Sequence, residues 1–162
     1  VQAESAAAVC KAVKGHTDLP VIMKLSPNVT DIVEIAKAVE AGGGNGVSLI
    51  NTILGMAIDI HRRKPVLGNI YGGLSGPAVK PVALRMVHQV YKGVNIPIMG
   101  LGGIMTGTDA IEFMMAGAQA VQVGVATMVD PTAISRIARE MGDYVEQYNL
   151  NSITDIVGAV HQ

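Results

Sequence analysis

The chain has 162 residues, of which 49% are hydrophobic and 15% are charged, so it can bury a core and fold as one domain. A net charge of −1 and an aromatic content of 3% argue against nucleic acids and anionic membrane surfaces as partners. No segment approaches the roughly 18 uninterrupted apolar residues of a membrane span, and without a visible signal peptide we expect a cytoplasmic protein.

The pattern along the chain alternates between helices and strands. Short runs of apolar, largely β-branched residues predict strands that are buried on both faces, as in a parallel sheet covered by helices. Apolar residues at helical spacing predict the helices between them. The expected order is helix 2–14, strand 19–25, helix 32–39, strand 46–52, a long connection 53–76, helix 83–90, strand 96–101, helix 106–117, strand 120–127 and helix 131–141.

Local signals mark several ends of these elements. Thr106 and Asp109 have the spacing of a capping box, which predicts the start of a helix. Glycines at 42, 93, 117 and 142 are expected to end helices. The connection 53–76 is long enough for a lid or binding loop, although a plain surface hairpin also fits it. Cys10 lies in an apolar helical setting and is expected to be a small buried side chain.

Repeated strand–helix units indicate an α/β fold, either an open doubly wound sheet or a (β/α)₈ barrel of the TIM type. The first strand ends in KLSPN and lacks the G-x-G-x-x-G turn of dinucleotide-binding folds, which favours the barrel. Four strands make half of such a barrel. We therefore expect residues 1–162 to be the C-terminal part of one barrel domain, with the N-terminal half preceding Val1.

Ligands of both architectures bind at the carboxyl ends of the strands. The first predicted strand ends at Lys24, whose ammonium, next to an apolar run, would favour an anion or a developing negative charge; a lysine reaching into solvent is the alternative. Asn51 and Thr52 end the second predicted strand and suit a planar, amide-like ligand, or else cap a loop.

Glycines lie at the carboxyl ends of the last two predicted strands. The pair Gly102–Gly103 precedes one helix and Gly124 precedes the next, so their N–H groups could receive a phosphate. A tight turn without a ligand fits the pair equally well. Gly76, before Pro77, opens another helix in the same way. The four histidines have no metal-ligand spacing with acidic partners, so we expect no metal site.

Five motifs occur in order over nearly the whole chain: KLSPNVTDI, SLINT, NIYGGLSGPAVKPVALRMV, IPIMGLGGI and AVQVG. Together they resemble the C-terminal half of the dihydroorotate dehydrogenase family, and GGLSGP is similar to its NAD-linked class (class 1B). The resemblance implies an FMN-dependent barrel that oxidises dihydroorotate to orotate in pyrimidine biosynthesis. It also implies a partner subunit that carries FAD and a 2Fe–2S cluster and passes electrons to NAD, and we expect a homo-oligomer.

The resemblance carries site residues over by motif. Asn51 and Thr52 would hold the substrate. FMN would contact Lys24, Ile50, Gly76, Gly102, Gly103, Gly124 and Val125. Val125 departs from the family, which often has Thr there, and would cost a hydroxyl contact to the FMN phosphate. The catalytic base of the family is a cysteine on an upstream loop, so it would precede Val1; Cys10 does not match it, and these residues alone are expected to be inactive.

Two other functions stay open from the sequence. The FMN barrel domain of a dihydropyrimidine dehydrogenase-like enzyme is similar and reduces uracil or thymine. A half-barrel could also bind phosphate ligands without catalysis, or associate with another copy through its exposed strand edges.

Overall fold

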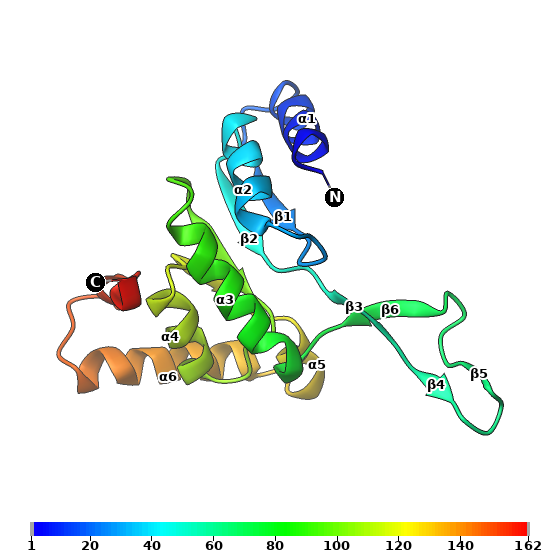
Figure 1. Cartoon of the computed structure of the whole chain (residues 1–162). Helices are drawn as coiled ribbons and strands as arrows, with labels where there is room; N and C mark the ends of the chain where they lie inside the picture. The colour runs from blue at the N-terminus through cyan, green and yellow to red at the C-terminus, as the bar shows by residue number, and fades with distance from the viewer. Residues whose placement is uncertain (1, 162) are drawn as a thin grey trace.

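The computed structural model of the protein describes residues 2–161 (Figure 1). Its helices are α1 Ala3–Lys14, α2 Ile32–Ala41, α3 Lys80–Tyr91, α4 Gly107–Met115, α5 Val125–Val129 and α6 Ala133–Gln147, with short 3₁₀ turns η1 Pro77–Val79, η2 Ile153–Ile156 and η3 Ala159–His161. Its strands are β1 Ile22–Leu25, β2 Gly46–Leu49, β3 Ile53–Met56, β4 Ile58–Asp59, β5 Lys64–Pro65, β6 Tyr71–Leu74, β7 Ile98–Leu101 and β8 Ala120–Gln122.

The central sheet has the strand order β1-β2-β7-β8, and all neighbours are parallel. Helices α2, α3 and α4 connect successive strands and pack against the sheet (Figure 1). Four parallel strands in sequential order with helices outside them are the repeating unit of a (β/α)₈ barrel, taken four times. The predicted α/β half-barrel is therefore confirmed.

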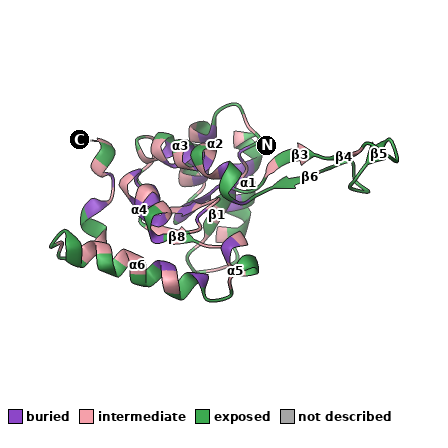
Figure 2. Ribbon diagram, turned by 90° about the horizontal axis from the view of Figure 1, so that it is seen from below, coloured by how far each residue is buried: buried purple, intermediate pink, exposed green. Residues whose placement is uncertain are grey.

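One face of the sheet forms the core with the helices. Val47 and Leu49 on β2 and Ile98 on β7 are fully or almost fully buried. Buried residues gather where α2, α3 and α4 meet these strands (Figure 2). Cys10, on α1, is completely buried and its thiol contacts the carbonyl oxygen of Val39, which confirms the predicted structural role.

The opposite face of the sheet is less covered. Side chains alternate along a strand, and register partners point the same way, so Lys24, Ser48, Met99, Leu101 and Gln122 share this face. Ser48 is buried, Met99 and Leu101 are partly exposed, and Lys24 and Gln122 are exposed. Among the described residues, no helix packs over these side chains in the way that α3 and α4 cover the other face.

Several predicted helix ends are confirmed. The Thr106 side chain accepts the N–H of Asp109 while the Asp109 carboxylate accepts the N–H of Thr106, so the capping box forms at the start of α4. Gly42 caps α2, and Gly117 follows α4 with a φ of +118°, a conformation that favours glycine. Gly93 follows α3 by two residues.

The C-terminal region departs from the prediction in two places. The strand predicted over 120–127 ends at Gln122, and Val125 opens helix α5 instead, because Gly124 turns the chain. The helix predicted over 131–141 is α6, Ala133–Gln147, and Gly142 lies inside it. A single glycine costs a helix only about 1 kcal/mol, which the apolar face of α6 on α4 can offset.

The long connection forms a projecting arm (Figure 1). Strands β3 and β6 pair antiparallel, and β4 and β5 pair beyond them. The surface-hairpin alternative therefore describes residues 53–74, while Ser75 and Gly76 lead into η1. None of the helices within residues 2–161 combines the length and apolarity that crossing a bilayer requires.

Gly100 on β7 gives a test of the packing between sheet and helices. A Cβ at this position would lie 2.6 Å from Cδ1 of Phe113 and 3.2 Å from Cβ of Ala118. We predict that Gly100→Val destabilises the fold by roughly 1–3 kcal/mol because Phe113 on α4 must move. Urea unfolding measures this change.

The matched control is Gly142→Ala, because no atom lies within 4 Å of a Cβ at that helical position. This variant should gain about 0.5–1 kcal/mol from helix propensity. Equal stability of the two variants would contradict the close packing of α4 on β7.

Candidate functional site

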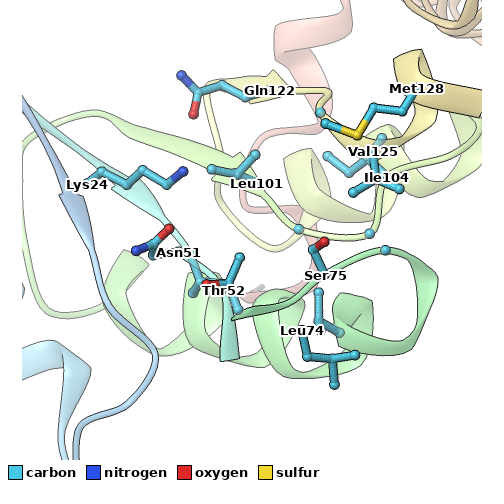
Figure 3. A pocket seen from close by; sticks show the side chains of 16 residues that line it. Lys24, Asn51, Thr52, Leu74, Ser75, Leu101, Ile104, Gln122, Val125 and Met128 are labelled. Carbon is cyan, nitrogen blue, oxygen red and sulfur yellow. The ribbon is translucent and has the colours of Figure 1, made fainter. Parts of the chain in front are cut away.

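A cavity of about 290 Å³ lies at the carboxyl edge of the sheet. Its walls come from the ends of β1, β2, β7 and β8 and from the start of η1 (Figure 3). All nine residues predicted for cofactor and substrate line it: Lys24, Ile50, Asn51, Thr52, Gly76, Gly102, Gly103, Gly124 and Val125. The structure thus brings the predicted residues to one place, and their binding roles stay predictions.

Lys24 is the cation of this cavity. Its side chain extends from β1 toward the cavity (Figure 3), and it has no hydrogen-bond or ion-pair partner among residues 2–161. The low-dielectric surroundings expected for it are absent in the described chain, because Lys24 is exposed and Ile22, on the same face, is 45% exposed. An unpaired ammonium at the cavity is nevertheless available to an anionic ligand.

Asn51 and Thr52 are held by their backbones. The N–H of Asn51 donates to the carbonyl of Leu25 at 2.8 Å. The side chain of Asn28 donates to the carbonyl of Thr52 at 3.0 Å and accepts from the N–H of Leu54 at 2.9 Å. Neither the Asn51 amide nor the Thr52 hydroxyl has a hydrogen-bond partner among the described residues, so they do not cap this loop and remain free for a ligand.

The glycine pair after β7 is required by packing. Gly102 and Gly103 have φ values of +130° and +78°, where side chains are strongly disfavoured. A Cβ on Gly103 would lie 2.7 Å from the carbonyl oxygen of Gly76 and 2.9 Å from Cβ of Lys80. The tight-turn interpretation is therefore correct for the backbone.

The turn at this glycine pair also leaves backbone N–H groups without hydrogen-bond acceptors. The N–H groups of Gly76, Gly102, Gly103 and Gly124 have no acceptor within residues 2–161. At Gly124 a Cβ would meet no atom within 4 Å, so the backbone there borders open space in the cavity. Backbone donors without partners, brought together by glycines, are the arrangement that accommodates phosphate oxygens.

An ion-pair cluster anchors the loop that carries the glycines. Lys80 at the start of α3 contacts Asp109 at 2.6 Å and Glu112 at 2.9 Å, both on α4. Asp109 also accepts the N–H groups of Met105 and Thr106, so it ties the loop after Gly103 to both helices.

The cluster shifts the pKa values of its members. Hydrogen bonds to Asp109 and then to Glu112 raise the pKa of the Lys80 ammonium above its ordinary range. Burial by itself would raise the pKa of Asp109, but the hydrogen bonds from Lys80, Met105 and Thr106 outweigh it and hold that pKa below its ordinary value. The ionised cluster therefore stabilises the fold around the cavity.

Sequence reasoning missed several residues that line the cavity, among them Ser75, Gln122 and Met128. Gln122 is the one with a visible signal, since it is a polar residue inside the apolar run AVQVG. Its carboxamide oxygen accepts a hydrogen bond of 2.7 Å from the hydroxyl of Ser48.

The histidines do not gather into a ligand set. His88 and His161 stack with ring centroids 4.1 Å apart, on the side of α3 away from the cavity, and Tyr91 packs on His161. Within residues 2–161, no group of three histidine, cysteine, aspartate or glutamate side chains is arranged to hold a metal ion.

Comparison with known proteins places these residues in a family. The sequence profile of the family described as dihydroorotate dehydrogenase matches residues 1–145. The catalytic subunit of dihydroorotate dehydrogenase B (NAD(+)) from Desulforamulus reducens is 62% identical over 97% of this chain and 52% of its own length. Proteins of the same name from Alkaliphilus oremlandii and Bacteroides thetaiotaomicron are 60% and 52% identical over 93% and 99% of this chain. The chain spans about half the length of these relatives.

Asp109→Asn tests the anchoring of the glycine loop. At neutral pH we expect a loss of about 0.5–2 kcal/mol, the range for a lost N-cap, measured by urea unfolding. Because folding lowers the pKa of Asp109, its contribution is present above the ordinary value of 3.8 and disappears as pH falls through the folded value. The difference between wild type and variant should therefore shrink by about pH 3.

Glu112→Gln is the control, since it removes the second carboxylate on Lys80 but no bond to the backbone. It should destabilise the fold less than Asp109→Asn does. A difference for Asp109→Asn that stays constant between neutral pH and about pH 3 would contradict the assigned role of the carboxylate.

Proposed function

The chain belongs to the dihydroorotate dehydrogenase family, and on that premise we propose that its cavity binds FMN and serves the oxidation of dihydroorotate to orotate in pyrimidine biosynthesis. The observation that carries the proposal is the convergence of two features in one cavity. An ammonium without a partner, on Lys24, and backbone donors without acceptors, on the glycines, line the same carboxyl edge of the sheet.

The residues present fit a flavin mononucleotide. The family is flavin-dependent. Gly103 and Gly124 offer N–H groups without acceptors for a phosphate, and Ile50, Leu101 and Val125 offer apolar surface for a planar ring. The choice of FMN rests on this pairing of a phosphate cradle with an apolar wall.

FMN, when bound, supplies hydride-accepting chemistry and gains negative charge as it is reduced. In this proposal the ammonium of Lys24 stabilises that charge, because it is fixed on β1 and already turned toward the cavity. Asn51 and Thr52 hold the cyclic, amide-containing substrate through their free amide and hydroxyl groups. The backbone hydrogen bonds of Asn51 and Thr52 hold this loop in place, so the substrate keeps a fixed orientation relative to the flavin.

The described residues offer no thiol for the role of catalytic base. Cys10 is completely buried between α1 and α2, and its thiol faces the carbonyl of Val39, so it does not line the cavity. We therefore propose that the cysteine base of the family comes from outside residues 1–162. The 162-residue chain alone is expected to show no dihydroorotate turnover.

The names of the relatives also bear on a partner. They are described as catalytic subunits of an NAD(+)-linked enzyme. For this chain we propose a corresponding partner subunit that carries FAD and a 2Fe–2S cluster and delivers electrons to NAD, and a homo-oligomeric catalytic subunit. No observation favours the dihydropyrimidine dehydrogenase alternative.

The proposal is tested with this chain fused behind the N-terminal half of the Desulforamulus reducens relative. The fusion should be yellow, release FMN on denaturation, and lose its absorbance near about 450 nm when dihydroorotate is added without oxygen. The 162-residue chain measured in parallel should show no such bleaching. A colourless fusion that takes up no FMN contradicts the proposed cofactor, and bleaching by the short chain alone contradicts the external base.

Lys24→Met tests the role of the ammonium. Because Lys24 is exposed and unpaired among the described residues, the variant should fold with unchanged stability. Flavin reduction by dihydroorotate in the fusion should slow by about 10²–10³-fold, the usual effect of losing one fixed donor to a developing charge. Stopped-flow absorbance measures this rate.

Lys11→Met, on an exposed position of α1, is the matched control and should leave the rate of flavin reduction unchanged. If both lysine variants reduce the flavin at the wild-type rate, Lys24 does not stabilise the reduced cofactor.

Gly124→Leu separates ligand binding from folding. The added side chain enters the cavity, since no atom lies within 4 Å of a Cβ there. We expect at least tenfold weaker FMN binding, which corresponds to about 1.4 kcal/mol, with a much smaller change in unfolding free energy. Fluorescence titration with FMN measures the affinity.

Gly68→Leu on the arm is the control, because a Cβ there also meets no atom within 4 Å and the residue lies outside the cavity. Equal FMN affinity for Gly124→Leu and Gly68→Leu would contradict an FMN site at Gly124.

A further inference from the structure

Ser48 stands out in the sheet as a buried polar residue. It is 3% exposed, and within residues 2–161 it is the one buried residue with a polar side chain. Its neighbours on β2, Val47 and Leu49, are completely buried apolar side chains. A hydroxyl in such a place needs a hydrogen-bond partner, and the partner identifies what the hydroxyl holds.

The partner of Ser48 is a side chain of the cavity. The hydroxyl of Ser48 donates to the carboxamide oxygen of Gln122 at 2.7 Å, across β7. With the oxygen engaged, the amide NH₂ is the free end of Gln122, and it has no acceptor among the described residues. The buried hydroxyl thus fixes which end of the carboxamide remains available as a donor.

Gln122 and Lys24 lie on the same face of the sheet. Lys24 is the register partner of Ser48, and Gln122 is the register partner of Leu101. Both side chains line the cavity, Lys24 from β1 and Gln122 from β8, the two edge strands of the sheet (Figure 3). The ammonium of Lys24, the hydroxyl of Ser48 and the carboxamide of Gln122 therefore form a polar row across this face of the sheet, below its carboxyl edge.

We propose that Gln122 is a further flavin-recognition residue and that Ser48 is the positioning residue that engages its carboxamide oxygen and so leaves the amide N–H as the end available to the cofactor. This inference rests on the proposed FMN site and extends it. A neutral donor in the same cavity as the Lys24 ammonium adds to the stabilisation of negative charge on the reduced ring, because hydrogen bonds to a charged acceptor are stronger than those to a neutral one. Gln122 thereby raises the reduction potential of the bound flavin.

Three variants of the fused protein described above test this inference. Gln122→Leu removes the donor, and Gln122→Glu replaces it with a carboxylate. Ser48→Ala keeps the donor but releases it. The measurements are the FMN dissociation constant, by fluorescence titration, and the flavin reduction potential, by equilibration with a reference dye.

Gln122→Leu should weaken the binding of reduced relative to oxidised flavin about tenfold, which lowers the potential by about 30 mV for a two-electron couple. Gln122→Glu should lower it further, because the carboxylate repels the reduced ring. Ser48→Ala should shift it in the same direction by less. A purely structural Ser48–Gln122 bond would change unfolding free energy and leave the potential where it was.

Gln119→Leu is the matched control. Gln119 lies just before β8, outside the cavity, and its carboxamide oxygen accepts the N–H of Ile98 at 2.7 Å. Its loss removes a comparable hydrogen bond and should leave the potential unchanged.

The outcomes separate this inference from the proposed function. If the wild-type fusion takes up no FMN, the proposed function fails and the inference fails with it. If wild type binds FMN but Gln122→Leu and Gln122→Glu share its potential and affinity, only the role of Gln122 is overturned. A shift for the Gln122 variants with none for Ser48→Ala overturns the positioning role of Ser48.

Discussion

The parallel register of four short strands is the constraint on which the rest of the structure depends. Because β1, β2, β7 and β8 run in the same direction, the residues after each strand meet at one edge. Lys24, Asn51, Gly102 and Gly124 are far apart in the sequence, and each stands at such an end. A change of direction in any one strand would remove its contribution from the cavity.

The absence of a side chain at the glycines of this edge serves both packing and ligand binding. Gly103 cannot carry a side chain, because its φ is positive and the carbonyl of Gly76 is too close. As a result, this part of the cavity wall consists of main chain alone, and its N–H groups have no acceptor among the described residues. Lys80 and Asp109 form an ion pair that anchors the loop after Gly103, so the loop has these contacts before any ligand binds.

Much of this arrangement could be predicted from the sequence. The apolar runs and helical spacing identified the four strands of the sheet and all helices except α5, and polar residues or glycines after the runs identified the cavity wall. The end of β8 was misplaced because Val125 and Ala126 continue an apolar run, while the turn at Gly124 depends on tertiary context. Gly142 failed as a stop because α6 packs on α4 on both sides of it. The bond from Ser48 to Gln122 spans 74 residues, so it follows from strand order, which periodicity does not reveal.

A crystal structure of the fused protein with FMN would show whether one ligand occupies this edge of the sheet. We expect the phosphate within hydrogen-bond distance of the N–H groups of Gly103 and Gly124, and the ring at the ammonium of Lys24. An FMN phosphate held elsewhere, with these main-chain groups facing water, would contradict it.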